Sequence, residues 1–162
     1  MVSSATVWVR ARIATAPAIY GLIVYEVLLT AESDDGHEPP YGVLLWSLVA
    51  FVVFYFAHVF AEVLARHGAD SLGLAARRGF AHSAGMLYAA ILPTLALVIA
   101  ALAGADGPEA TGWALIVGLA VLAYIGYQAT AMRGRTFWWR ILGAVLAAFV
   151  GFVVMFLEYL VH

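Results

Sequence analysis

Residues 41–66 read YGVLLWSLVAFVVFYFAHVFAEVLAR and decide the fold of the chain. The stretch is long enough to cross a bilayer, because about 20 apolar residues cover a hydrocarbon core of about 30 Å. Toward its C-terminal end it carries His58 and Glu62, one helical turn apart. An ionisable group at membrane depth costs about 2.5–3.5 kcal/mol on insertion scales, so such a group normally has a partner or a function. The stretch therefore predicts a membrane span that contains a polar site.

The composition predicts that the rest of the chain is embedded in the membrane as well. Hydrophobic residues make up 65% of the 162 residues and charged residues 11%, whereas soluble domains average about 45–50% and about 25%. A chain of this length leaves no room for a separate soluble domain, so we expect residues 1–162 to form a single transmembrane domain. The absence of cysteine excludes disulfides, thiolate catalysis and cysteine-ligated metals.

Hydropathy and helix-breaking residues divide the chain into five apolar segments. Residues 67–82 are ambiguous, because they can form a short interfacial helix capped by Asp70 or extend the third span inward. Pro93 predicts a kink within that third span. The five predicted spans cover residues 13–31, 41–66, 83–104, 110–132 and 137–161.

The eight basic residues are all arginines, and they fall on one side of the predicted spans. They precede the first span or follow the second and fourth, whereas acidic residues follow the first and third. Because arginine-bearing loops stay in the cytoplasm, the N-terminus is predicted inside and the C-terminus outside. Pro17 and Glu26 interrupt the first apolar segment, which favours a retained span over a cleaved signal peptide. The prediction is an all-α bundle of five transmembrane helices in a cell membrane, of the bacterial inner-membrane type.

Small residues recur every four positions in two of the predicted spans. Gly143, Ala147 and Gly151 form such a stripe in the fifth span, and a second stripe lies in the third. A small-xxx-small stripe lets another helix backbone approach closely. We therefore expect helix contacts along these stripes and a homo-oligomer in the lipid bilayer.

The candidate polar site lies on one face of the 41–66 helix. Tyr55, His58, Glu62 and Arg66 share that face through steps of three, four and four residues, and His82 begins the third span on the same side of the membrane. A histidine and a carboxylate one turn apart can ligate a divalent metal ion or share a proton. His58, Glu62 and His82 are thus candidate metal ligands. The structural alternative is a Glu62–Arg66 ion pair with His58 hydrogen-bonded to a neighbour.

Glu26 in the first span is the acidic residue predicted to lie deepest in the membrane. It is either a cation or proton site, or a carboxyl group bonded to a polar group of another helix. Glu26, Tyr55, His58 and Glu62 together form the predicted ion or proton pathway. Phosphate-binding loops, nucleophile elbows and the HExxH zinc motif are absent, and the arginine distribution gives no support for nucleic-acid binding.

Three segments of the chain carry a resemblance to small, uncharacterised integral-membrane proteins of high-GC bacteria. The segments are ARIATAPAIYGLIVYE (11–26), FAHVFAE (56–62) and RRGFAHSAGM (77–86). The resemblance implies a membrane fold and adds nothing to the chemistry. The leading functional prediction is a small oligomeric channel or transporter for cations or protons. The alternatives are a non-transporting membrane scaffold or accessory subunit, and an intramembrane metal-dependent enzyme.

Overall fold

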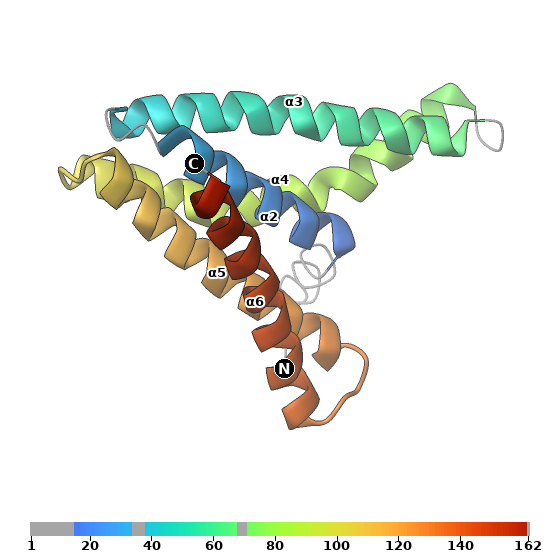
Figure 1. Ribbon diagram of the computed structural model, residues 1–162. Helices are drawn as coiled ribbons and strands as arrows, with labels where there is room; N and C mark the ends of the chain where they lie inside the picture. Colours follow the sequence, from blue (N-terminus) through green and yellow to red (C-terminus); the bar gives the residue numbers. More distant parts are fainter. Residues whose placement is uncertain (1–14, 34–37, 68–70, 162) are drawn as a thin grey trace.

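The computed structural model describes residues 15–33, 38–67 and 71–161, all of which form helices or the short connections between them. This confirms the all-α prediction. Asp70 and the first two residues of the predicted 13–31 span lie outside the described ranges. The helices are α2 (Ala16–Ser33), α3 (Pro40–Arg66), α4 (Leu72–Leu102), α5 (Gly107–Ala131) and α6 (Phe137–Val161) (Figure 1).

Four of these helices, α3, α4, α5 and α6, are long and apolar enough to cross a membrane. The chain is therefore a multi-pass membrane protein. The fourth candidate span, within α6, covers Phe137–Leu157 and is only 11% buried inside the protein, so most of its apolar surface is left for lipid. Helix α2 has 18 residues and would be about 27 Å long, but it is not among the four.

Helix α2 lies inside the bundle and contacts each of the other four helices, as α5 also does. The largest side chains on its buried faces are Leu22, Tyr25, Glu26 and Leu29, all 0% exposed. At Gly21 an added Cβ would lie 2.6 Å from the Cβ of Met86, so α2 and α4 pack there with no room for a side chain. Seven of the 18 residues of α2 are thus buried, and the acidic residue Glu26 is one of them.

The remaining helices form two antiparallel hairpins, α3–α4 and α5–α6, which diverge from each other in Figure 1. The N-terminal end of α3 and the C-terminal end of α4 lie on the same side of the bundle as the start of α5. The tips of the two hairpins, which carry the arginines, point in different directions. Helix α2 lies between the hairpins and holds them together.

The buried face of α3 follows a four-residue repeat. Because a helix turns about 100° per residue, a four-residue step drifts by about 40° and the buried stripe winds slowly around the helix. This winding allows α3 to contact α2, α4 and α5 at successive levels. The stripe consists of Val43, Ser47, Phe51, Tyr55 and Val59.

Helix α4 is continuous from Leu72 to Leu102, so residues 72–82 extend the third span rather than forming a separate interfacial helix. Pro93 lies inside this helix, and the ribbon changes direction along its course (Figure 1). The next residue, Thr94, donates a hydrogen bond of 2.8 Å to the Ala90 carbonyl and bonds the Tyr25 hydroxyl of α2 at 2.8 Å. The proline region of α4 is therefore tied to the central helix.

The small-residue stripe of α6 packs against α5 within the same chain. A Cβ added at Gly126 of α5 would lie 2.9 Å from the carbonyl carbon of Gly143 and 2.7 Å from the Cβ of Ala147. A Cβ added at Gly151 would collide with Leu122 of α5. The close helix contact predicted for this stripe is present, but its partner is α5, so the stripe does not supply a surface for self-association.

Candidate functional site

A cavity of about 270 Å³ lies between the N-terminal end of α2 and the α3–α4 hairpin. It brings together all three side chains predicted as a cluster, His58, Glu62 and His82. Helix α2 supplies the remaining wall. We call this cavity the His58 pocket; its lining residues are Ala16, Pro17, Tyr20, His58, Glu62 and His82.

Glu62 is the charged centre of the pocket and has a basic group on each side. Its Oε2 accepts a hydrogen bond from Nε of Arg66 at 3.1 Å, one turn later on α3. Its Oε1 lies 3.6 Å from Nε2 of His82 on α4. The Glu62 side chain is 24% exposed and that of His82 is 46% exposed, so neither is fully enclosed by the protein. Protonation of His82 would complete a second ion pair and bind α4 to α3.

His58 lies deeper in the pocket, two turns of α3 before Arg66. Its Nε2 is buried and has no hydrogen-bond partner among the described residues. The imidazole lies 6.1 Å from the Tyr20 ring, centroid to centroid. An unpartnered imidazole nitrogen beside a cavity is available to bind a proton or to accept a hydrogen bond from a small molecule.

The two histidines of the pocket belong to a repeated tripeptide, Phe-Ala-His, at 56–58 and 80–82. Because α3 and α4 run antiparallel and pack together, the repeats face each other. Phe56 and Phe80 meet edge to face with their ring centroids 6.4 Å apart, and both histidines line the pocket. The sequence-based prediction did not use this repeat, although the repeat indicates that the two helices pack against each other.

The described residues contain no group of three or more His, Cys, Asp or Glu side chains arranged to hold a metal ion. His58, Glu62 and His82 line one cavity, but only Glu62 and His82 form a recorded contact. Metal binding by these three residues stays a prediction without structural support. A tightly ligated transition metal needs ligands that converge on one point.

Tyr55 and Glu26, the other two residues of the predicted pathway, lie away from the pocket. Tyr55 is 7% exposed and packs against the rings of Phe56 and Phe80, at centroid distances of 5.7 and 6.4 Å. Glu26 lies on the opposite side of α2 from the pocket, against Gly118 of α5 and Gly151 of α6. No hydrogen bond recorded in the described part of the chain links Glu26 to the pocket residues.

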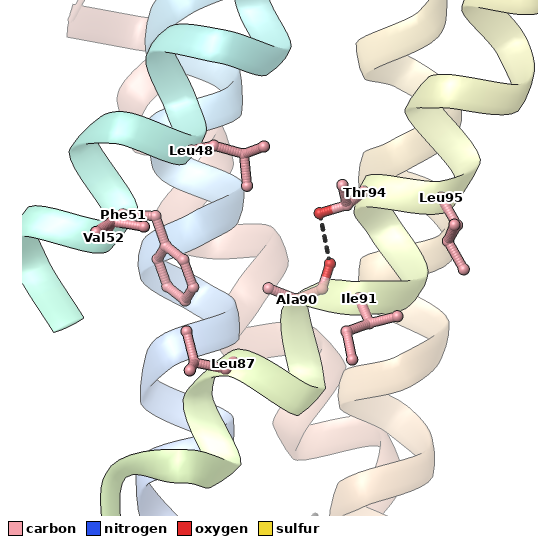
Figure 2. Close-up of a pocket in the computed structure, with 8 residues that line it drawn as sticks. All are labelled: Leu48, Phe51, Val52, Leu87, Ala90, Ile91, Thr94 and Leu95. Carbon is pink, nitrogen blue, oxygen red and sulfur yellow. Dashed lines mark hydrogen bonds between the residues drawn. The ribbon is translucent and has the colours of Figure 1, made fainter. Parts of the chain in front are cut away.

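A second groove, of about 250 Å³, lies between α3 and α4 and is shown in Figure 2. Its walls are apolar apart from the Thr94 hydroxyl, which is used in the bond to Ala90 drawn there. A larger apolar groove of about 410 Å³ lies between α4 and α5. Neither groove carries groups for acid–base or metal chemistry. The lining residues of the groove in Figure 2 are Leu48, Phe51, Val52, Leu87, Ala90, Ile91, Thr94 and Leu95.

Comparison of the chain with protein-family models, with curated proteins and with solved structures finds no match. The functional assignment therefore rests on the geometry of the pocket.

Proposed function

We propose that the protein is a small membrane channel or transporter for cations or protons, and that the His58 pocket binds the transported ion. The observation that supports this proposal is the gathering of three ionisable side chains around one cavity between α2, α3 and α4. Such groups are rare in membrane helices, and those that face a cavity commonly mark ion or proton paths.

The pocket can exchange a cation for a proton because the Glu62 carboxylate lies beside a histidine that can take up a proton. Arg66 offsets the Glu62 carboxylate, and His82 can take up a proton beside it. Neutral histidine leaves room for a cation next to Glu62, whereas charged histidine replaces that cation. Binding at the pocket is then coupled to pH, which is the property expected of a proton-linked transporter or a pH-gated channel.

The proposed membrane arrangement has five spans, with α2 included as the first of them. The chain begins inside and ends outside, because the arginines cluster at the tips of the α3–α4 and α5–α6 hairpins. The His58 pocket then opens toward the inner side, between those tips. A bundle of five helices hardly encloses a pore alone, so the proposal includes a homo-oligomer whose contacts involve surfaces other than the Gly143–Gly151 stripe.

The direct test is ion flux into liposomes that contain only this protein. Proton movement is followed with an enclosed pH-sensitive dye, and Na⁺ and K⁺ gradients are imposed in parallel, with protein-free liposomes as the control. We expect flux of protons or of one of the cations above the protein-free rate. Absence of flux for every ion, in both directions and across the pH range of histidine titration, would contradict the proposal.

A second candidate function is a membrane scaffold or accessory subunit, and one observation favours it. Both oxygens of Glu62 already face a basic group, as in a structural network that fixes α3 against α4. In that case Glu62→Gln would lower the thermal stability of the detergent-solubilised protein, and the purified protein would conduct nothing. Transport predicts flux in the wild type and loss of flux in a folded Glu62→Gln variant.

A further inference from the structure

Glu26 is the most enclosed ionisable carboxyl group among the described residues. It lies in the middle of α2, a helix that contacts all the others, and it is 0% exposed. Neither of its carboxyl oxygens has a hydrogen-bond partner in the described part of the chain. A buried polar group without a partner is rare in native structures and calls for a functional explanation.

The space for this carboxyl group is made by two glycines on two other helices. A Cβ added at Gly118 of α5 would collide with Oε1 of Glu26 and lie 2.9 Å from its carboxyl carbon. A Cβ added at Gly151 of α6 would lie 3.4 Å from Oε2. Each oxygen therefore faces a position where any other residue would place a side chain. The α5–α6 hairpin holds the carboxyl group by its shape rather than by charge or hydrogen bonds.

Several ionisable groups of the helices packed against α2 are engaged elsewhere or lie toward the helix ends, and His58 lies in the pocket on the other side of α2. No recorded bond joins any of them to Glu26 within the described ranges. On its own helix, Tyr25 bonds Thr94 of α4. On α3, Tyr55 packs in the aromatic cluster between α3 and α4, and Glu62 pairs with Arg66 and His82. Glu109 is exposed at the start of α5. Arg140 of α6 donates a hydrogen bond to the Arg135 carbonyl.

We propose that Glu26 is an intramembrane proton-binding site, in which a neutral carboxyl group is enclosed by Gly118 and Gly151 and exchanges its proton with solvent. An ionised carboxylate in this place would have no opposite charge and no hydrogen-bond donor to stabilise it. A bound proton removes the charge and lets the group stay between the two glycines. Release of the proton requires the α5–α6 hairpin to move away from α2, so that water or a cation reaches the carboxylate.

This site deepens the proposed function by naming the proton as the bound species, and in that respect it rests on that function. The two sites are nevertheless independent in space, because α2 presents Tyr20 to the His58 pocket and Glu26 to the opposite side. A measurement that reads Glu26 directly can therefore fail while ion flux persists, and flux can fail while the Glu26 result stands.

The test is infrared spectroscopy of the whole protein in lipid, in which a protonated carboxylic acid shows a carbonyl stretch separate from the amide bands. We expect one such band at the high-frequency end of the carboxylic range, because the group accepts and donates no hydrogen bond. The band should be lost in Glu26→Gln, shift on transfer to D₂O, and weaken as the pH is raised from about 5 to about 9.

Two glycine variants keep the test informative if Glu26→Gln fails to fold. Gly151→Ala adds a methyl group 3.4 Å from Oε2 of Glu26 and should move the band; the same methyl group also displaces the end of the Leu122 side chain. Gly112→Ala, on the open side of α5 with no atom within 4 Å of the added Cβ, should leave it unchanged. If no carboxylic-acid band responds to Gly151→Ala or to loss of Glu26, then the Glu26 carboxyl group is ionised and the proposal is overturned. A Glu26 band insensitive to both D₂O and pH would overturn it as well, by showing a sealed structural group.

Discussion

Glu26 of α2 lies directly against Gly118 of α5, so the size of the residue at one position limits the size allowed at the other. Gly118 has no side chain and is buried, and any Cβ there would overlap a Glu26 oxygen. Overpacking of this kind costs about 1–3 kcal/mol. The pair is therefore suited to a double-mutant test, because shortening one residue removes the clash that lengthening the other creates.

The first prediction concerns that pair. Gly118→Ala should lower the unfolding free energy by about 1–3 kcal/mol in the wild-type background, and most of this loss should disappear in the Glu26→Ala background. The measurement is reversible denaturation of the detergent-solubilised protein by sodium dodecyl sulfate. Equal costs of Gly118→Ala in both backgrounds would show that Glu26 does not lie against Gly118.

The hydrogen bond between Tyr25 and Thr94 is a second contact that can be tested at the residue scale. It joins the central helix to α4 immediately after Pro93. Hydrogen bonds between membrane helices contribute about 0.6 kcal/mol on average and about 1.7 kcal/mol at most. We expect Tyr25→Phe to destabilise the protein by an amount in that range, measured by the same denaturation. Tyr124→Phe, at a residue 48% exposed on α5, is the control and should change nothing.

Part of the candidate site could be predicted residue by residue, and part could not. His58 and Glu62 were predicted from their spacing on one helix, and His82 from its place on the same side of the membrane; all three line the pocket. Tyr20 was missed, because the face that α2 turns toward α3 depends on packing against four helices at once. Gly118 was missed too, although the small residues at four-residue steps in α5 are the signal that would have found it. Those residues are Ala110, Ala114 and Gly118, with Gly126 two such steps further along.

At the scale of the elements, α5 and α6 approach so closely that their glycines determine the contact. Gly126 lies against the backbone of Gly143, and Gly143 in turn against Thr130. Backbone atoms cannot move aside as the end of a long side chain can. The stability of this hairpin should therefore depend on the absence of a single methyl group.

The third prediction compares two glycines of the same helix. Gly126→Ala should destabilise the protein, because the added Cβ would lie within 3 Å of Gly143 and Ala147 of α6. Gly112→Ala, with nothing within 4 Å, should stabilise it by up to about 1 kcal/mol through helix propensity. Thermal unfolding of the two variants beside the wild type gives the measurement. Similar effects of the two substitutions would place the α5–α6 contact elsewhere.

The helices themselves were largely predictable, because hydropathy, proline pairs and turn residues mark where apolar segments stop. The predicted spans 110–132 and 137–161 agree with α5 and α6 within a few residues. The start of α4 was not determined by the sequence, since residues 72–82 suit an interfacial helix as well as a longer span. The partner of the Gly143–Gly151 stripe was also not predictable, because a stripe of small residues records close packing without saying which helix packs there.

At the scale of the whole molecule, the acidic ends of the helices lie close together, whereas the arginine-bearing tips of the two hairpins diverge (Figure 1). At the acidic end, Asp106 caps α5 by accepting a 2.9 Å hydrogen bond from the Glu109 amide, and Gly107 lies against the Glu38 carbonyl. The His58 pocket lies toward the other end. The proposed topology puts the arginine-bearing end in the cytoplasm, so the helices would converge outside and separate inside.

The fourth prediction tests that orientation with single cysteines, which is direct because the native chain has none. Ala103→Cys, at the end of α4, should react with membrane-impermeant maleimide added to intact cells. Gly73→Cys and Thr136→Cys, at the tips of the two hairpins, should react only after the membrane is permeabilised. All three positions are exposed, and Gly73 has open space for a side chain. The reverse labelling pattern would place the arginines outside and the His58 pocket on the outer side.

The measurement that tests the central claim most directly is the pH profile of ion flux for His58→Ala in liposomes. Histidine changes charge between about pH 5 and about pH 8, so a pocket that handles ions through His58 should give flux that varies across that range. We predict that His58→Ala removes or shifts this dependence, while Val53→Ala, 66% exposed on the lipid side of α3, retains the wild-type profile. A folded His58→Ala protein with the wild-type rate and pH profile would contradict the assignment of the pocket.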